Sequence, residues 1–520
     1  MIDRHAPIVP PAGRREWTGL AIIALPCLVY AMDLTVLNLA IPAISASLSP
    51  SSSQLLWIID IYGFMVAGLL ITMGTLGDRF GRRRLLLIGA ALFAAASVGA
   101  ALSRSVGMLI TMRALLGVAG ATVAPSTLSL IRNMFHDAQQ RRFAIGVWIA
   151  SYSLGGVIGP LVGGVVLQWA NWHAIFLVAV PVMVLLLLLG PKLLPEYKDA
   201  QAGRIDAASV LLSMGAALGS IHALKQLAEH GVSAPALASL VSGLALGVAF
   251  VRRQSRLAYP LLDLSLFRRP VFGAAIAAYA LSCLAMFGVY VFLLQYLQGV
   301  LGLSPLAAGL ATVPWSAAFV LGSLLAPRLT RAHALPHVIV GGLLAAAPGF
   351  LLLAFVDQRG GLAMAVAGTV VTSLGLAPVF TLVSDVIVTA APPQRAGAAS
   401  AISETCSEFS AASGIALLGS LGIWLYRARM QPVLDATLPA ALHGDALATL
   451  GGTLAAAHAM GGAAGAALDA AARAAFAETF RTVALVATGV VVAAALIAAR
   501  LLRSPPQPAP TPAPAPSAWP

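Results

Sequence analysis

Five carboxylate side chains lie inside long apolar stretches of the sequence, where an isolated charge is unfavourable. A carboxylate at the centre of a bilayer costs about 2.5–3.5 kcal/mol on insertion scales, so each one needs a partner, water or a proton. Glu404 and Glu408 are four residues apart and therefore share one face of a helix. Such groups can exchange protons or hold a cation, although Asp385 could equally cap a helix. The five residues are Asp33, Asp60, Asp385, Glu404 and Glu408.

Aromatic residues accompany two of these carboxylates. Tyr30 precedes Asp33 by three residues. Trp57 precedes Asp60 by three residues, and Tyr62 follows it by two. An aromatic face beside a carboxylate suits a bulky, weakly hydrated cation. Since a low dielectric constant favours the neutral carboxyl group, protonation and cation binding compete for one site. This competition predicts the exchange of a lipophilic cation for H⁺.

The elements that must position these groups are membrane-spanning helices. Of the 520 residues, 59% are apolar and 10% are charged, whereas soluble domains carry about 25% charged residues. A water-soluble globular protein is therefore excluded. Apolar stretches of about 20 residues, the length that one span needs, occur fourteen times. They cover about residues 18–42, 54–77, 84–103, 107–130, 143–169, 173–191, 205–226, 234–251, 271–298, 305–327, 336–356, 361–389, 397–426 and 478–500.

Basic residues are distributed unevenly between the two sides of the predicted bundle. The chain has 31 Lys and Arg against 19 Asp and Glu, a net charge of +12. A cytoplasmic N-terminus places 23 of the 31 in inner segments and six, including Lys225, in outer segments; Arg113 and Arg481 fall within helices. This positive-inside pattern predicts a multi-pass protein of the bacterial cytoplasmic (inner) membrane with both termini in the cytoplasm. It explains the basic excess better than nucleic-acid binding does.

Two segments fall outside the predicted spans. Residues 427–477 are rich in Ala and Gly and form a predicted outer loop, whose composition allows short amphipathic helices or a hairpin. The tail from Pro505 reads PPQPAPTPAPAPSAWP, which predicts an extended, disordered segment. Neither segment indicates a soluble enzyme domain.

The segment GTLGDRFGRRRLLL, residues 74–87, joins the second and third predicted helices on the cytoplasmic side. It resembles the G-x-L-a-D-r-x-G-r-k motif of the major facilitator superfamily, although Gly77 and Arg83 replace the usual Ala and Lys. In that family the motif is a conformational latch between the two halves. The matching residues are Gly74, Leu76, Asp78, Arg79, Gly81 and Arg82.

The run SLGGVIGPLVGG in the fifth predicted helix has two faces of small residues. Glycines recur every four residues on one face, and such faces let helices touch backbone to backbone. The run resembles the antiporter motif of drug-exporting major facilitator proteins; a generic packing face is the alternative. The first face carries Gly155, Gly159 and Gly163, and the next carries Gly156, Pro160 and Gly164.

Arg113 opens the run RALLGVAGA inside the fourth predicted helix. An arginine within a span is costly and functional by default. The run resembles the family's R-x-x-q-G-x-g-a-A motif, with Leu116 in place of Gln and Ala119 in place of the second Gly. The resemblance implies that Arg113 assists proton transfer.

Together these motifs resemble the 14-helix drug:H⁺ antiporter branch of the superfamily, and within it the QacA/SmvA-type exporters of quaternary ammonium compounds. The resemblance implies an all-α major facilitator fold of two six-helix bundles with two inserted helices. The predicted parts are a cytoplasmic arm (1–17), an N-terminal bundle (18–191), a linker with the inserted helices (192–252), a C-terminal bundle (253–503) and a Pro/Ala tail (504–520).

The implied function is proton-driven efflux of lipophilic cations such as quaternary ammonium compounds, dyes and biguanides. We expect no catalytic residue, no metal site, no cofactor other than the coupling H⁺, and a monomer in the lipid bilayer without a nucleic-acid partner. An exporter of neutral or anionic antibiotics or metabolites, and a non-transporting membrane sensor, are the alternatives. The predicted proton-coupling residues are Asp33, Arg113, Glu404 and Glu408, and the predicted substrate-binding residues are Tyr30, Asp33, Trp57, Asp60, Tyr62, Glu404 and Glu408.

Overall fold

The computed structural model describes residues 12–198, 206–257, 264, 270–356, 361–390, 396–437 and 449–501. Within these ranges the chain forms helices and no strand, and fourteen helical stretches are long and apolar enough to cross a membrane. These stretches follow the fourteen predicted spans in order. The predicted class, an all-α multi-pass membrane protein, is therefore confirmed. The predicted tail, 504–520, lies outside the described residues.

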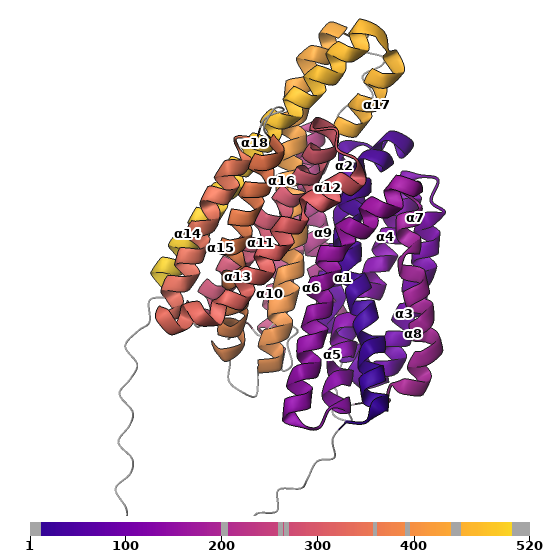
Figure 1. Cartoon of the computed structure of the whole chain (residues 1–520), viewed down its shortest axis with the longest axis vertical. Helices are drawn as coiled ribbons and strands as arrows, with labels where there is room; N and C mark the ends of the chain where they lie inside the picture. Colours follow the sequence, from indigo (N-terminus) through magenta and orange to yellow (C-terminus); the bar gives the residue numbers. More distant parts are fainter. Residues whose placement is uncertain are drawn as a thin grey trace, which may run out of the picture.

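The N-terminal half consists of α1 to α8 (Figure 1). Two predicted spans are interrupted: residues 107–130 form α4 and α5, and residues 173–191 form α7 and α8. Thr122 stands between α4 and α5, where its hydroxyl donates to the Ala119 carbonyl. The helices are α1 (Arg14–Leu48), α2 (Ser52–Phe80), α3 (Arg82–Ala101), α4 (Val106–Gly120), α5 (Val123–Met134), α6 (Ala138–Trp169), α7 (Ala174–Leu177) and α8 (Ala179–Leu193).

The C-terminal half consists of α11 to α18 and a short π-helix, η2. Each half has its own large cluster of buried apolar side chains: one is built from α1 to α8, and the other almost wholly from α11 to α18. The elements are α11 (Pro270–Gln295), η2 (Tyr296–Val300), α12 (Pro305–Ala311), α13 (Val313–Ala332), α14 (Leu335–Leu353), α15 (Gly361–Ala390), α16 (Ala396–Thr437), α17 (Leu450–Met460) and α18 (Gly462–Leu501).

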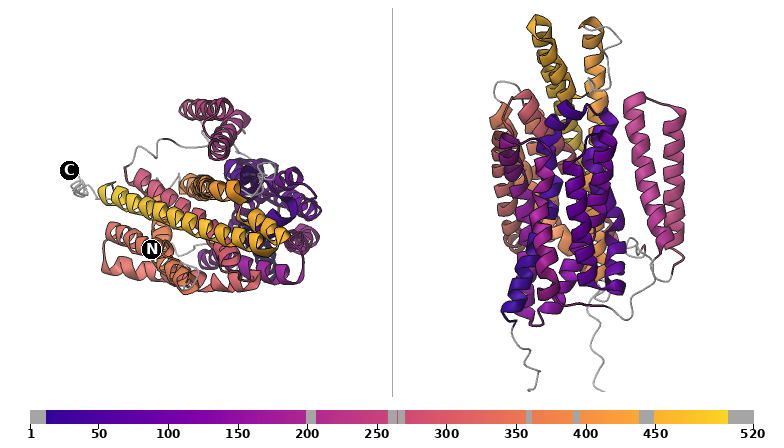
Figure 2. Two further views of the ribbon diagram at one scale, coloured as in Figure 1. Left: turned by 90° about the horizontal axis from the view of Figure 1, so that it is seen from above. Right: turned by 90° about the vertical axis from the view of Figure 1, so that its right-hand side faces the viewer.

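Between the halves in sequence, α9 (Ala207–His230) and α10 (Ala234–Gln254) form a hairpin at the edge of the bundle (Figure 2). The two helices approach closely because Gly219 faces Gly243; a Cβ on Gly243 would lie 2.6 Å from the nitrogen of Ser220. Helix α9 packs against α2 of one half and α16 of the other. The hairpin therefore lies beside a seam between the halves.

An ion pair joins the start of α9 to the end of α10. The Arg253 guanidinium donates two hydrogen bonds, of 2.9 and 2.8 Å, to the Asp206 carboxylate. These bonds hold the pKa of Asp206 to about 2, below its usual value. Because the pKa is lowered, the pair stabilises the hairpin at higher pH and is lost only as the pH falls toward 2. The Asp206–Arg253 ion pair is thus intact at physiological pH.

The predicted outer loop, 427–477, is largely helical where the structure describes it. Helix α16 continues to Thr437, α18 begins at Gly462, and α17 lies between them. Figure 1 shows this segment projecting beyond one end of the bundle. Helix α17 also reaches the N-terminal half, since a Cβ on Gly451 would meet Ser45 of α1 at 2.8 Å. The segment is a helical hairpin rather than an irregular loop, one of the two forms that its composition allows.

Candidate substrate and proton site between the halves

The first glycine face of α6 lies directly against α1, the helix that carries Tyr30 and Asp33. A Cβ on Gly155 would lie 2.2 Å from the Leu28 carbonyl oxygen, and one on Gly159 would lie 2.2 Å from a side-chain oxygen of α1. Gly163 packs against Val36 in the same way. Because these positions lack side chains, α1 is held at backbone distance from α6, and its functional face turns toward the interior.

The second face of α6 joins the two halves. A Cβ on Gly164 would lie 2.7 Å from the Cα of Leu306, and one on Gly309 would lie 2.5 Å from the Pro160 carbonyl. Leu306 and Gly309 both belong to α12, in the C-terminal half. Gly156, by contrast, has open space around it. The glycine motif therefore packs α1 on one side and the opposite half on the other.

The glycine face gives a stability prediction with a matched control. We expect Gly155→Ala to destabilise the protein by about 1–3 kcal/mol, the usual range for an overpacked contact, because the new methyl group collides with the α1 backbone. Gly156→Ala, in the neighbouring position with open space, should leave the melting temperature unchanged. Thermal unfolding of the two purified variants measures this difference. Equal melting temperatures would contradict the close packing of α6 on α1.

Arg113 is buried between α4, α1 and α2. Two glycines of its motif allow α4 to approach α2, since a Cβ on Gly117 would lie 2.6 Å from the Tyr62 carbonyl oxygen and one on Gly120 would lie 2.9 Å from the Tyr62 hydroxyl. The Arg113 guanidinium donates to the Ile58 carbonyl at 3.2 Å and lies 4.7 Å from the centre of the Tyr62 ring. Leu116 and Ala119, which depart from the family motif, are both buried.

Asp33 is the ionic partner of Arg113. The Arg113 Nη1 and Asp33 Oδ2 atoms are 2.5 Å apart, and the two side chains are 1% and 9% exposed. A charge-assisted hydrogen bond of this kind is among the strong ones. The structure thus brings together two predicted proton-coupling residues that are separated by 80 positions in the sequence.

Glu408 meets the other side of α1. The Tyr30 hydroxyl donates a 2.9 Å hydrogen bond to Glu408 Oε1, and this bond joins α1 of the N-terminal half to α16 of the C-terminal half. The Tyr30 ring lies 6.0 Å from Tyr62 and 5.5 Å from Tyr152, centre to centre. Sequence reasoning did not select Tyr152, although it lies one residue before the glycine motif. An aromatic cluster of Tyr30, Tyr62 and Tyr152 therefore contacts both Arg113 and the half-buried Glu408.

Glu404 lies one turn from Glu408 along α16, as the four-residue spacing predicts. Its surroundings differ, however: Glu404 is exposed, while Glu408 is half-buried against Tyr30. Asp385 lies in α15, and its side chain is outside the described part of the chain. Of the two predicted carboxylates on α16, Glu408 is the one that the structure joins to α1.

Asp60 does not open onto this cluster. Its Oδ1 atom lies 2.9 Å from the Nζ of Lys225 on α9, and both side chains are fully buried. The Lys225 ammonium also lies 3.8 Å from the centre of the Trp57 ring. The assignment of Lys225 to an outer segment was wrong: it lies inside α9, five residues before the helix ends at His230. The available sequence signal was a lone lysine just inside the end of the predicted span 205–226.

The segment between α2 and α3 makes a sharp turn. Gly81 has φ +114°, a conformation that L side chains rarely adopt, and its amide donates to the Gly77 carbonyl at 2.9 Å. The next residue, Arg82, donates to the Pro125 carbonyl at 3.2 Å. The glycines of the motif therefore have a local role in this turn.

A further contact of this turn also lies within the N-terminal half. The Arg83 amide donates to Glu196 Oε1 at 3.1 Å, in the segment after α8. Gly74 lies within α2, Arg79 is exposed, and the side chain of Asp78 is outside the described residues. The latch between the two halves accordingly stays a prediction.

Two helical bundles meet around buried charged and aromatic side chains, which is the arrangement that secondary transporters use. Residues 23–415 match the Major Facilitator Superfamily, and the chain belongs to this family. The family resemblance drawn from the motifs is therefore confirmed.

Relatives and solved structures agree with this assignment. The chain is 43% identical to the multidrug efflux pump LfrA of Mycolicibacterium smegmatis over 443 residues, 85% of this chain and 88% of LfrA. It is 34% identical to the methyl viologen resistance protein SmvA of Salmonella typhimurium, over 78% of this chain and 82% of SmvA. A bacterial homologue of the human lysosomal transporter Spinster superposes with a TM-score of 0.67 at 19% identity, covering 95% of this chain and all of that one. That structure supports the fold alone.

Proposed function

We propose that this protein is a proton-driven multidrug efflux antiporter that exports lipophilic organic cations in exchange for H⁺. The observation that carries the proposal is the hydrogen bond between Tyr30 and Glu408, which crosses between the halves three residues from the Asp33–Arg113 pair. A transporter that alternates access must break and remake contacts of this kind between its halves. The charge on Glu408 can therefore shift the equilibrium between the inward-open and outward-open states, because it changes the strength of the hydrogen bond with Tyr30.

The proton side of the exchange rests on the Asp33–Arg113 pair. Protonation of Asp33 removes the negative charge that holds the guanidinium, so Arg113 keeps only its contacts with the Ile58 carbonyl and the Tyr62 ring. Breaking a buried pair is expensive. Proton uptake at Asp33 is thus coupled to a rearrangement of α1, α2 and α4, the helices that line the aromatic cluster.

The cation side rests on Glu408 and the tyrosines. An organic cation is attracted by the carboxylate of Glu408 and by the faces of Tyr30 and Tyr62. Binding there competes with the Tyr30 hydrogen bond and with protonation of Glu408. The relatives support this substrate class: LfrA is named a multidrug efflux pump and SmvA a methyl viologen resistance protein, and methyl viologen is itself an aromatic organic dication.

In the proposed cycle, a cation binds from the cytoplasmic side to the deprotonated site and leaves on the outer side when protons replace it. The basic inner segments support the orientation, with both termini in the cytoplasm and the protein in the bacterial inner membrane. Each chain contains both the Asp33–Arg113 pair and Glu408, so we propose that a monomer carries out the exchange, with H⁺ as the coupling ion.

A cell assay tests the proposal. We expect cells that express the protein to extrude preloaded ethidium, and a protonophore to reduce the rate to that of cells without the protein. The loss follows because, without a proton gradient, proton entry no longer supplies the free energy for net export of the cation. Cellular ATP is measured in parallel as the control. Continued extrusion with ATP present and the gradient collapsed would contradict proton coupling.

A further inference from the structure

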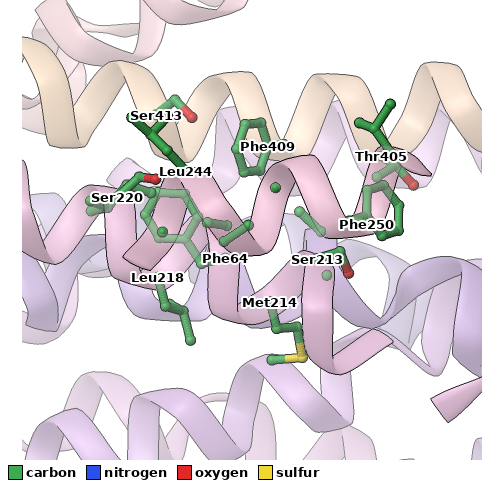
Figure 3. Close-up of a pocket in the computed structure, with 18 of the residues that line it drawn as sticks. Phe64, Ser213, Met214, Leu218, Ser220, Leu244, Phe250, Thr405, Phe409 and Ser413 are labelled. Carbon is green, nitrogen blue, oxygen red and sulfur yellow. The ribbon is translucent and has the colours of Figure 1, made fainter. Parts of the chain in front are cut away.

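An apolar chamber of about 940 Å³ lies between the inserted hairpin and the two halves. Its walls come from α2, α9, α10, α11 and α16. Figure 3 shows Phe64 of α2 and Phe409 of α16 in its wall, where their rings meet edge to face with centroids 6.0 Å apart. The volume lies near the upper end of the range for ligand pockets, about 300–1,000 Å³. The chamber is therefore large enough for a long, flexible hydrocarbon chain.

The walls of the chamber are apolar side chains that the rest of the described chain does not cover. Leu244 and Val248 line it from α10, and Phe409 and Leu417 line it from α16; all four side chains are exposed. Walls of this kind offer water few hydrogen-bond partners, so water is a poor occupant. Within a bilayer, hydrocarbon is the occupant that matches them.

The chamber extends along the helices over about the depth of one leaflet. On α9 its lining runs from Ser213 to Leu224, a rise of about 16 Å at about 1.5 Å per residue. The hydrocarbon core of a bilayer is about 30 Å thick, so one leaflet contributes about 15 Å. On α10 the lining runs from Gly243 to Arg252, close to the end of that helix. The chamber therefore matches the acyl chains of a single leaflet, the one at the end of α10.

Arg252 is the only charged residue among the described residues that line the chamber. It lies two residues before the end of α10 at Gln254. The adjacent Arg253 pairs with Asp206, whereas Arg252 is exposed and forms no ion pair within the described part of the chain. Its positive charge disfavours a cation in the chamber and favours a phosphate, to which a guanidinium donates charge-assisted hydrogen bonds.

Two buried hydroxyl groups add hydrogen-bond donors to the chamber wall. Thr72 of α2 and Thr405 of α16 line the chamber, and their Oγ1 atoms are buried without a hydrogen-bond partner among the described residues. A buried hydroxyl without a partner is costly. Figure 3 shows Thr405 and Phe250, which lies two residues before Arg252, at one side of the chamber and Ser413 at the other. The ester oxygens that adjoin the phosphate of a phospholipid are suitable acceptors for such hydroxyls.

We propose that the chamber binds an anionic phospholipid, whose acyl chain lies between the inserted hairpin and the two halves and whose phosphate pairs with Arg252. Basic pockets between membrane helices on the cytoplasmic side bind such head groups. In the orientation proposed above, α10 ends on the cytoplasmic side, so the lipid comes from the cytoplasmic leaflet. Because the lipid contacts α2, α16 and the hairpin together, it stabilises this arrangement of the halves. The inference does not depend on which substrate the protein transports.

The experiment titrates the purified, delipidated full chain in detergent with one of two lipids. Dioleoyl phosphatidylglycerol is anionic, whereas dioleoyl phosphatidylcholine has the same acyl chains and no net charge. Native mass spectrometry measures the fraction of protein that carries lipid. We expect phosphatidylglycerol to half-saturate the protein at a concentration about fivefold lower than phosphatidylcholine, the effect of about one basic residue near an anionic head group. It should also raise the melting temperature more.

Substitutions of arginine test the head-group contact. Arg252→Gln should abolish the preference for phosphatidylglycerol, and Arg252→Lys, which keeps the charge, should retain it. Arg256→Gln is the matched control: Arg256 is exposed and lies four residues further along the chain, but it does not line the chamber. This variant should bind both lipids as the parent protein does. Size-exclusion chromatography shows that each variant is folded.

A bulky substitution tests whether the lipid lies in the chamber. Val248→Trp places an indole ring in the chamber and should weaken the binding of both lipids. Val241→Trp is its control, since Val241 is exposed on the same helix and does not line the chamber. If Val248→Trp does not fold, Leu244→Trp takes its place.

Three results would overturn the inference. Equal half-saturating concentrations of the two lipids in the parent protein would mean that any lipid fills the chamber. An equal preference in the parent and Arg252→Gln would remove Arg252 from the site. Unchanged binding in the variant with the filled chamber would place the lipid elsewhere on the protein. Because lipid binding is measured without transport, a failure of ethidium export would contradict the proposed function and leave this inference standing.

Discussion

Asp33→Asn is expected to abolish ethidium export while the protein still reaches the membrane. The amide keeps the shape of the side chain and one acceptor oxygen for Arg113, but it cannot take up or release a proton. The Asp33 carboxylate lies 2.5 Å from the Arg113 guanidinium, and both are buried. Because the proton exchange that drives the cycle is lost, we expect the rate of export to fall by at least about 100-fold, which corresponds to about 2.7 kcal/mol in the barrier. Dye efflux from preloaded cells measures the rate.

The control for this variant separates coupling from stability. Size-exclusion chromatography of the fluorescently tagged protein shows whether Asp33→Asn is folded. The double variant Asp33→Asn/Arg113→Gln removes both buried charges and should recover the melting temperature without recovering export. If the double variant exported ethidium at the normal rate, the pair would be a structural element and Asp33 would have no part in proton exchange.

Glu408→Gln is expected to produce the second large loss. A glutamine still accepts the hydrogen bond of the Tyr30 hydroxyl, so the contact between α1 and α16 survives, but the negative charge that attracts a cation is gone. A charge–charge contact contributes about 1–4 kcal/mol between the dielectric limits of water and protein surroundings. We therefore expect ethidium to bind about tenfold more weakly or worse. Equilibrium binding to purified protein measures the change.

Glu404→Gln is the matched control, because it removes the same charge one helical turn away. Glu404 is exposed and makes no described contact with Tyr30, so its substitution should weaken ethidium binding much less. Tyr30→Phe, which removes only the hydroxyl, tests the contact between the halves. Equal losses in Glu404→Gln and Glu408→Gln would place the cation along the whole α16 face and contradict a site centred on Tyr30 and Glu408.

Much of this fold follows from local properties of the sequence. A span needs about 20 apolar residues, and every span contains them, so the helix order could be predicted. The glycine face of α6 could also be predicted, because spacing along one helix fixes which residues share a face. Its partners could not: nothing local indicates that Gly155 faces Leu28 while Gly164 faces α12 of the other half.

The sequence did not predict which residues that are far apart along the chain contact one another in the structure. Asp33 and Arg113 were both predicted to act with protons, but their contact depends on how α1 and α4 pack. Lys225 was missed because it stands near the end of an apolar stretch, where a positive charge usually marks the membrane surface. Only the position of α9 beside α2 turns Lys225 inward to Asp60. The prediction of Asp60 as an open cation site changes accordingly, since that site already contains an ammonium group.

The extension of α16 and α18 beyond the bundle has a similar explanation. The apolar signal ends near residue 426, but α16 continues through Arg427 and Arg429 to Thr437. Alanine is the strongest helix former, and the Ala-rich composition after Gly462 continues α18 in the same way. Hydropathy marks the part of a helix that lies in lipid and not the point at which the helix ends.

The most direct test of the central claim is the movement of protons in vesicles that contain only the purified protein. With a pH-sensitive dye inside the vesicles, ethidium added outside should be carried inward in exchange for protons carried outward. The internal pH should therefore rise in proportion to ethidium uptake. Vesicles with Asp33→Asn should give no change. A cation-dependent pH change in the wild-type vesicles alone is the result that antiport predicts; ethidium transport without any proton movement would contradict it.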